Sequence, residues 1–251
     1  MESYLYDEIF KMEQKHWWFC AKRKIVLSLI KKYLPLNSPE KDIKVYDLGC
    51  GCGMMLMDLS KCGYNALGFE SNNLALEYCR KRGVKAFNSE ITQKIELNDN
   101  SADCVTLLDV LEHVEDEKKV LSEVFRILKP GGLLICTVPA YQWLWTRRDE
   151  FHHHKKRYNK NDIIKLFKSF SQCNVILASY INCFLFPIAL CERFIRKKFS
   201  PSASGDLSLP KFGINAILKN IFSLERFFLK NNISLPFGLS VIAIIQKDTK
   251  R

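Results

Sequence analysis

The sequence predicts an α/β fold in which a mostly parallel sheet is covered by helices on both faces. Two observations carry this prediction. Short apolar runs alternate with stretches of helical periodicity from residue 43 to residue 140, and strands separated by helices of this length form βαβ units. The first apolar run also passes into a glycine-rich turn and then into a helical stretch, as the first strand of such a unit does.

Each element is expected from its local pattern. Apolar runs predict strands over 43–48, 64–69, 84–87, 104–108, 133–138, 174–180 and 239–246. Helical periodicity predicts one or two helices over 7–34, and further helices over 54–62, 71–82, 116–129, 159–170, 183–199 and 211–230. Pro130-Gly131-Gly132 is expected to stop the helix over 116–129. Residues 141–158 are expected to form a loop, and residues 200–209 have linker composition.

Composition bounds the class of protein. The 251 residues are 47% hydrophobic and 26% charged, which excludes a disordered chain, a collagen-like fibre and a multi-span membrane protein. The ten cysteines include no CxxC pair, which disfavours a structural zinc site and indicates a reducing compartment. The N-terminus shows no apolar signal sequence, and Pro187 interrupts the borderline apolar stretch 174–191. A cytoplasmic protein is therefore expected.

The net charge of +11 is unevenly distributed. Residues 41–140 carry 12 basic and 15 acidic side chains, so the basic excess lies mainly after residue 140. This excess favours an anionic partner, such as nucleic acid, a phospholipid surface or a phosphorylated substrate. A generally basic, solvated surface is the alternative.

The glycine-rich turn Val45–Gly53 (VYDLGCGCG) is the most informative segment. An apolar strand delivers Asp47, and glycines follow at 49, 51 and 53. A dinucleotide fingerprint would place its third glycine at the position of Met54, which disfavours a nicotinamide-dependent dehydrogenase. Glu70 ends the second strand, where a carboxylate can accept both hydroxyls of a ribose. The combination suits an adenosyl ligand without a pyrophosphate.

Four motifs in this order resemble the class I S-adenosylmethionine-dependent methyltransferases. DLGCGCG at 47–53 resembles their first motif, and Glu70 their ribose-binding acidic residue. Residues 103–114 (DCVTLLDVLEHV) and 124–132 (VFRILKPGG) are similar to their fourth strand and to the following helix and glycine stop. His16–Phe19 (HWWF) and residues 235–240 (LPFGLS) are similar to an uncharacterised bacterial branch.

The resemblance implies a Rossmann-like, seven-stranded, mostly parallel sheet, with N-terminal helices and a helical insertion before the last strand. It also implies one domain over 1–251. Within it we expect an N-terminal helical cap (1–40), a cofactor-binding half (41–140) and an acceptor-side half (141–251) with the insertion at 183–230. The implied cofactor is S-adenosylmethionine.

By the same resemblance, Asp47 and the backbone of 49–53 would hold the methionine end, and Glu70 the ribose. Glu90 would hold the adenine edge, although Ser89-Glu90 departs from the usual Gly-Asp. Asp109 would lie near the reacting methyl group. The implied cofactor-binding residues are Asp47, Gly49, Cys50, Gly51, Gly53, Glu70, Ser71, Glu90, Asp109 and Val110.

Candidate catalytic residues are less well marked. His113 follows the fourth strand, where ligands bind in open α/β sheets, and His154 and Tyr158 lie in the aromatic and basic segment 141–158. Each can instead be structural, by starting a helix or by docking the loop on the sheet. No metal is expected, because the adjacent side chains of His152–His154 seldom converge on one ion. Trp17 and Trp18 either cover the cofactor or anchor the N-terminal helices on the core.

Three functions remain in consideration. The favoured one is methyl transfer to a small-molecule, lipid-linked or saccharide-linked acceptor, preferably anionic, with peripheral membrane contact through 183–230. The second is a nucleic-acid methyltransferase whose Arg147, Arg148 and Lys155–Arg157 contact phosphates, although no Asn-Pro-Pro-Tyr-like motif is present. The third is a binding module for an adenosyl ligand without turnover.

Overall fold

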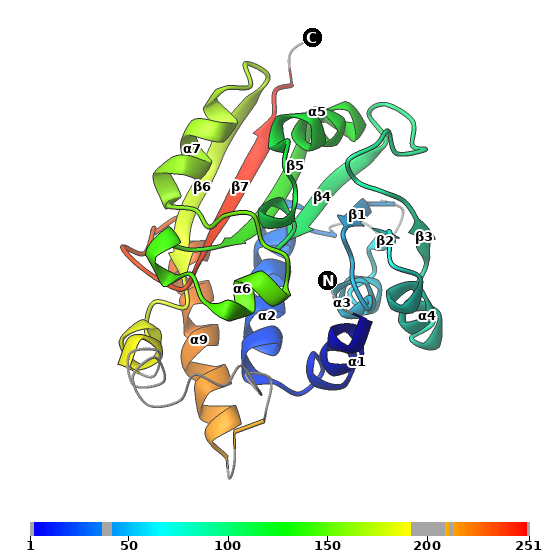
Figure 1. Cartoon of the computed structure of the whole chain (residues 1–251). Coiled ribbons are helices and arrows are strands. Elements are labelled where there is room, and N and C mark those ends of the chain that lie inside the picture. The colour runs from blue at the N-terminus through cyan, green and yellow to red at the C-terminus, as the bar shows by residue number, and fades with distance from the viewer. Residues whose placement is uncertain (1–2, 37–41, 192–208, 211–212, 250–251) are drawn as a thin grey trace.

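The structure is a computed structural model that describes residues 3–36, 42–191, 209–210 and 213–249. These residues contain one seven-stranded sheet (Figure 1). Its strands are β1 (Lys44–Leu48), β2 (Asn65–Glu70), β3 (Ala86–Asn88), β4 (Ala102–Leu108), β5 (Leu128–Pro139), β6 (Cys173–Ile181) and β7 (Ser240–Lys247).

The strand order is β3-β2-β1-β4-β5-β7-β6. Strands β1 to β5 are parallel to their neighbours, and β7 is antiparallel to both β5 and β6. The predicted Rossmann-like, mostly parallel sheet is confirmed. Because the order reverses between β1 and β4, the loops that follow these two strands diverge and leave the place where open α/β sheets bind ligands.

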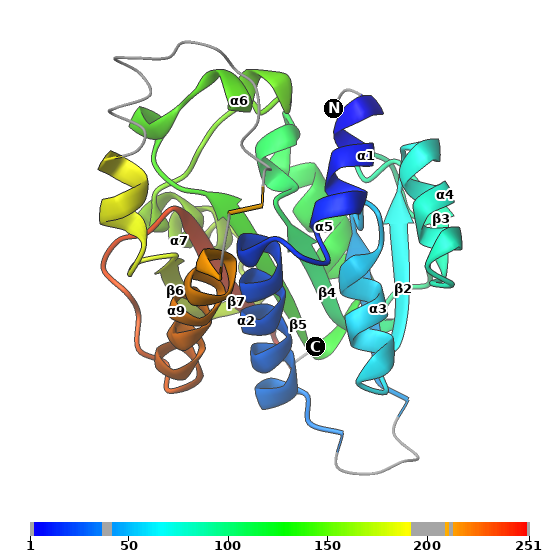
Figure 2. The same cartoon turned by 90° about the horizontal axis from the view of Figure 1, so that it is seen from below.

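Helices cover both faces of the sheet (Figures 1 and 2). The described helices are α1 (Ser3–Met12), α2 (Trp17–Tyr33), α3 (Met54–Lys61), α4 (Asn73–Lys81), α5 (Glu117–Ile127), α6 (Arg147–Phe151), α7 (Lys160–Lys168) and α9 (Ile214–Lys230). Apolar residues of α2, α3 and α9 pack in one core cluster, and those of α5 and α7 pack in the other. The helix α9 lies beside α2 (Figure 2).

Some boundaries differ from those expected. The segment 7–34 is two helices, because the His16 side chain caps the start of α2 by accepting the Trp18 N–H. The segment Pro130–Gly132 lies inside β5, because the chain passes from α5 into extended structure at Leu128. The segment 141–158 is not a plain loop, since it contains a 3₁₀ turn (Gln142–Leu144) and α6.

The expected helix over 183–199 is only partly described. Residues 186–191 are helical, whereas residues 192–208 lie outside the described part of the chain, together with most of the expected linker. Within the described residues, no helix combines the length and the apolar character needed to cross a bilayer.

The first helix is held on the sheet by a buried arginine. The Arg82 guanidinium pairs with the Glu13 carboxylate and also donates to Cys52 O at 2.5 Å and to Phe10 O at 3.2 Å. The Phe10 ring stacks on Tyr78 of α4, with 4.0 Å between ring centroids. The segment at the end of α1 is therefore tied to α4 and to the glycine loop at once.

Replacement of this arginine should loosen the N-terminal helices. The Arg82 side chain is only 3% exposed, so Arg82→Ala leaves the Glu13 carboxylate buried without its cation and should cost about 3 kcal/mol of unfolding free energy. The measurement is urea denaturation followed by circular dichroism. Arg80→Ala, at an exposed position of the same helix, is the control and should change stability by no more than about 0.5 kcal/mol. Equal losses in the two variants would refute the proposed role of Arg82.

Candidate functional site

The glycine loop 49–53 connects β1 to α3 at the carboxyl edge of the sheet. Gly51 has φ +53° and its absent side chain points into open space, because a Cβ there would meet no atom within 4 Å. Gly53 has φ +80°, and a Cβ there would lie 2.8 Å from Cys79 Sγ and from Val84 Cγ2. Glycine is therefore required at 53 for close packing, whereas at 51 it leaves the backbone open to a ligand.

Glu70 joins the ends of β2 and β1. Its Oε2 accepts the Gly51 N–H at 3.0 Å, and its Oε1 accepts the Asn72 N–H at 2.9 Å. Each carboxylate oxygen has a second lone pair, so the carboxylate can still accept two hydroxyl groups. Ser71 follows directly and is exposed. The structure thus places Glu70 against the glycine loop, and its expected contact with a ribose stays a prediction.

Asp47 is buried at the end of β1. Its Oδ1 accepts a hydrogen bond from Thr106 Oγ1 of the neighbouring strand β4 at 2.5 Å. Burial raises the pKa of Asp47 to about 7, although the Thr106 hydroxyl acts in the opposite direction. Asp47 can therefore gain or lose its charge near neutral pH, according to what approaches it.

The end of β4 carries an ion pair that the motifs do not reveal. Asp109, at φ +57°, pairs with Lys22 of α2 and accepts Thr137 Oγ1 at 3.0 Å. Lys22 is buried, and its Nζ lies 4.7 Å from the centre of the Trp18 ring. A lysine within the apolar face of an amphipathic helix was the signal available in the sequence. The adjacent Val110 is buried.

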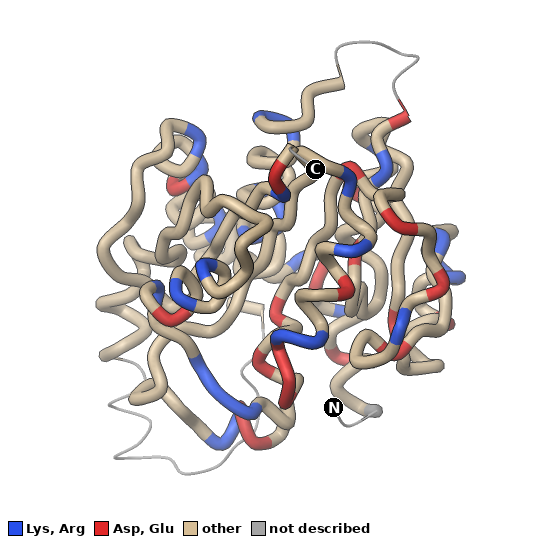
Figure 3. The backbone as a smooth tube through the Cα atoms, turned by 90° about the horizontal axis from the view of Figure 1, so that it is seen from above, with Lys and Arg blue, Asp and Glu red and all other residues tan. Residues whose placement is uncertain are grey.

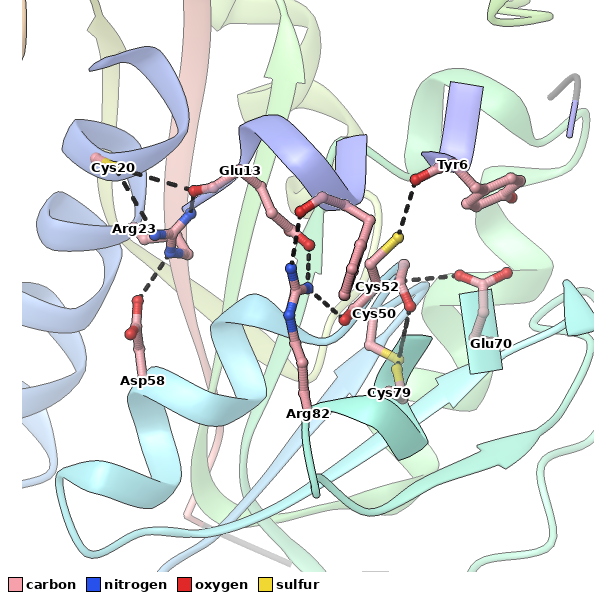
Figure 4. A network of polar contacts seen from close by, with 12 residues as sticks. Tyr6, Glu13, Cys20, Arg23, Cys50, Cys52, Asp58, Glu70, Cys79 and Arg82 are labelled. Carbon is pink, nitrogen blue, oxygen red and sulfur yellow. Dashed lines mark hydrogen bonds and ion pairs between the residues drawn. The ribbon is translucent and has the colours of Figure 1, made fainter. Parts of the chain in front are cut away.

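Helix α1 covers the glycine loop (Figure 4). Cys52 Sγ donates to Tyr6 O at 3.6 Å, and Cys79 Sγ donates to Gly51 O at 3.3 Å. Burial and the nearby Glu70 carboxylate raise the pKa of the Tyr6 hydroxyl. The N-terminal helices thus form one wall of the site.

Glu90 lies farther from these groups than the other predicted residues. It follows β3 and is exposed, and its Oε1 accepts Thr92 Oγ1 at 3.2 Å. The preceding residue, Ser89, donates its N–H to Glu70 O at 3.1 Å. Glu90 is therefore at the same edge of the sheet as Glu70, and its expected contact with an adenine stays a prediction.

Of the three catalytic candidates, the two histidines are neighbours. The rings of His113 and His154 lie edge to face, with 4.7 Å between their centroids. Burial lowers the pKa of His113 to about 4, so its imidazole is neutral at physiological pH. His154 Nδ1 lies 2.8 Å from Asp149 Oδ1. Tyr158 is buried instead, and its hydroxyl is bonded to Leu111 O at 3.0 Å and to Glu117.

The basic residues of the segment 141–158 are largely ion-paired. Arg157 is bidentate to Asp149, at 2.7 and 2.9 Å, and Lys155 and Lys156 pair with Glu115 and Glu117. Acidic and basic stretches are interspersed over much of the molecule (Figure 3). These cations therefore hold the segment against η1 (Leu111–His113) and α5.

Aromatic side chains gather at the carboxyl ends of β5 and β6. Tyr141 stacks on Tyr180 with 5.0 Å between centroids, and Trp143 and Phe186 lie 5.4 and 5.9 Å from the Tyr141 ring. The next residues after β6 are held by α9, because Glu225 accepts the N–H groups of 182–184 at 2.6–3.1 Å. This part of the carboxyl edge is apolar, unlike the acidic part formed by the ends of β1, β2 and β4.

Trp17 anchors α2 to α9, because its ring lies 6.2 Å from that of Phe222 and its backbone N–H donates to Asn215 Oδ1 at 2.8 Å. This contact supports the anchoring interpretation of Trp17. Trp18 lies instead beside Lys22, close to the site.

Comparisons with known proteins agree with this geometry. Residues 46–136 match the family described as a methyltransferase domain. The chain is similar to a sterol 24-C-methyltransferase of Gibberella zeae (32% identity over 126 residues, 47% of this chain and 32% of that protein). It is also similar to a ubiquinone biosynthesis O-methyltransferase of Colwellia psychrerythraea (34% over 99 residues, 37% of this chain and 40% of that protein). The match thus spans well under half of either relative.

The likeness to a solved structure extends over most of the chain. A SAM-dependent methyltransferase from Archaeoglobus fulgidus superposes with a TM-score of 0.55 at 17% identity, covering 90% of this chain and 94% of that one. At this identity the likeness concerns the fold.

The buried Asp47 should make stability depend on pH. The pKa of Asp47 is about 7 in the folded protein, above the ordinary value of 3.8. The folded state therefore holds this proton more tightly than the unfolded state. The resulting contribution to the free energy of unfolding is fully present below about pH 4 and is lost as the pH rises to about 7. Asp47→Asn removes this titration, so the variant should become progressively more stable relative to the wild type as the pH rises from 4 to 7. The change approaches about 1.4 kcal/mol per pH unit.

Urea denaturation of both proteins at several pH values measures this difference in stability. The other carboxyl groups are present in both proteins, so their effects cancel in the comparison. A difference in stability that stays constant from pH 4 to pH 8 would contradict a neutral, buried Asp47.

Proposed function

We propose that this chain, a member of the class I S-adenosylmethionine-dependent methyltransferases, transfers a methyl group from S-adenosylmethionine to an apolar small-molecule acceptor. One observation carries the proposal. Asp47, the open backbone at Gly51 and the Glu70 carboxylate lie together at the ends of β1 and β2, within the residues that match the methyltransferase domain.

The residues at this edge suit the cofactor. Glu70 retains acceptor capacity for two ribose hydroxyls, the space beside Gly51 is open, and Asp47 can ionise opposite an ammonium group. When bound, S-adenosylmethionine supplies an activated methyl group on a positively charged sulfur. The acidic balance of residues 41–140 suits such a cationic ligand.

The protein's own residues would act by alignment. The bound cofactor would supply the methyl group to an acceptor atom held in line with the sulfur–carbon bond. S-adenosylhomocysteine would be the leaving group, and the proton of the acceptor would pass to solvent. Lys22 holds the Asp109 carboxylate at the end of β4, and Val110 and Trp18 exclude water beside it. Holding the reacting atoms in a fixed orientation, with water excluded, lowers the entropic part of the activation barrier.

An apolar, lipid-linked acceptor is the class that the surroundings favour. The cluster of Tyr141, Trp143, Tyr180 and Phe186 lies at the same carboxyl edge of the sheet as the proposed cofactor site, where β5 and β6 end. The named relatives, a sterol methyltransferase and a ubiquinone-biosynthesis methyltransferase, support the same choice. A nucleic acid is less favoured, because Arg157 is buried against Asp149, and Lys155 and Lys156 are paired with carboxylates that a phosphate would have to displace.

Loss of the open space at Gly51 should weaken cofactor binding. Gly51→Ala places a methyl group where the cofactor backbone contact is proposed, so the affinity for S-adenosylhomocysteine should fall about tenfold or more. Isothermal titration calorimetry measures it. Gly83→Ala is a matched control, because Gly83 also has positive φ (+68°) and no atom within 4 Å of its Cβ position. Both variants carry the same backbone strain of about 1 kcal/mol.

A wild-type protein that does not bind S-adenosylhomocysteine, or equal losses in the two variants, would contradict the proposal. Turnover is then tested with S-adenosylmethionine labelled in the methyl group. Label transferred to a solvent-extractable lipid fraction supports the proposed acceptor class, and label on nucleic acid supports the alternative. Binding without transfer to either class indicates a non-catalytic binding module.

We also infer that α2 and α9 contact an anionic membrane surface. The outward side of α9 exposes Ile217 (59%), Leu224 (50%) and Phe227 (53%) at helical spacing. The acidic side chain of this helix pair, Glu225, is fully buried. A pocket between the helices has Lys24 and Arg226 in its lining. An apolar stripe flanked by cations is complementary to anionic lipid headgroups.

Sedimentation with lipid vesicles tests this surface. Binding to vesicles containing phosphatidylglycerol should exceed binding to pure phosphatidylcholine vesicles and should weaken at high salt. Phe227→Ser should weaken it several-fold, whereas Phe87→Ser should not, because Phe87 is equally exposed (51%) but lies on β3 at the other edge of the sheet. Equal binding to both vesicle types, or no effect of Phe227→Ser, would refute the inference.

A further inference from the structure

Three side chains with metal-binding atoms converge beyond the end of β4. Glu112 and His113 belong to η1, and His154 follows α6 in the segment that folds back over it. One ligand atom from each of the three lies within 4.8 Å of the other two. Two ligands of one zinc ion, each about 2.1 Å from it, are separated by at most about 4.2 Å. Small side-chain rotations would therefore bring all three onto one ion.

The Glu112 carboxyl group is the strongest indication of a missing partner. The residue is 1% exposed, and both carboxylate oxygens are buried without a hydrogen-bond partner among the residues that the structure describes. A buried acidic group without a partner is costly. A bound cation at this position would satisfy both oxygens.

The two histidines are already oriented by other groups, as ligating histidines are in metal sites. His154 Nδ1 lies 2.8 Å from Asp149 Oδ1, which leaves Nε2 for a ligand. Asp149 is itself fixed by Arg157 and by the Thr146 N–H at 2.8 Å. The His113 ring packs edge to face on the His154 ring, with 4.7 Å between their centroids.

We propose that Glu112, His113 and His154 bind a divalent transition metal ion, best matched by Zn²⁺. Two imidazoles and one carboxylate are borderline-soft ligands, which favour zinc, iron, cobalt or nickel over Mg²⁺ or Ca²⁺, whose preferred ligands are all oxygen. Three protein ligands leave a fourth position open, as in catalytic rather than structural zinc sites.

The site adjoins the proposed methyl-transfer centre, because Glu112 is three residues after Asp109. An ion held there would attract an anionic oxygen of the acceptor and would lower the pKa of a bound hydroxyl group. This consequence rests on the proposed function. Binding of the metal does not, since it requires neither cofactor nor acceptor.

Cobalt titration of the untagged, chelator-treated full chain tests the site. We expect one equivalent of Co²⁺ to bind with a visible d–d absorption band, to be displaced by Zn²⁺, and to resist an equal concentration of Mg²⁺. The band should lack sulfur-to-cobalt charge transfer, which distinguishes this site from binding to one of the ten cysteines.

Glu112→Gln keeps the shape of the side chain and removes its charge, and it should weaken Co²⁺ binding at least tenfold. His154→Gln should do the same, whereas His153→Gln, the adjacent histidine outside the cluster, should bind like the wild type. Thermal melts with and without Zn²⁺ verify folding, and the metal should raise the Tm of the wild type but not that of Glu112→Gln.

Absence of a stoichiometric band, or wild-type binding by Glu112→Gln, would overturn the metal site. The two proposals fail separately. If the protein binds cobalt but not S-adenosylhomocysteine, the metal site is supported and the proposed function is contradicted. If it binds S-adenosylhomocysteine but not cobalt, the proposed function is supported and the metal site is contradicted.

Discussion

Acidic side chains held out of water at the carboxyl edge of the sheet determine how this edge is built. A buried carboxylate is stable only when another group compensates for its lost hydration. Glu70 accepts two backbone N–H groups, and Asp109, whose side chain is 29% exposed, pairs with the buried ammonium of Lys22. Asp47 receives one hydroxyl from Thr106, and its pKa rises to about 7. Because the partners come from β4, α2 and the loops, these contacts also hold the elements in register.

The same constraint makes the N-terminal helices part of the site. Lys22 brings a cation from α2 to the end of β4, and Arg82 ties Glu13, just after α1, to the backbone of the glycine loop. Ligand entry beside Gly51 is therefore coupled to the position of α1. The contacts that hold α1 lie beside the glycine loop, close to the opening at Gly51 (Figure 4).

The parts of the structure that the sequence predicts are those encoded by neighbouring residues. The mostly parallel sheet follows from apolar runs that alternate with helical stretches, and the place of Glu70 at the end of β2 follows from an apolar run that ends in a carboxylate. Lys22 and Glu112 could not be assigned, because their roles depend on segments far apart in the chain. The capping box of α6, in which Thr146 and Asp149 cap each other, turned an expected loop into a helix.

The basic residues after residue 140 differ in whether they have acidic partners, and this difference also depends on contacts between distant segments. In the segment 141–158, Arg157 is buried against Asp149 of α6, and the more exposed Lys155 and Lys156 pair with Glu115 and with Glu117 of α5. These charges add to the net charge of the chain but already have acidic partners. Cations on the outward side of α2 and α9 have no acidic side chain exposed on the same two helices. Within the part of the chain that the structure describes, some of the positive charge therefore lies beside an apolar helix stripe, which suits the lipid surface proposed above.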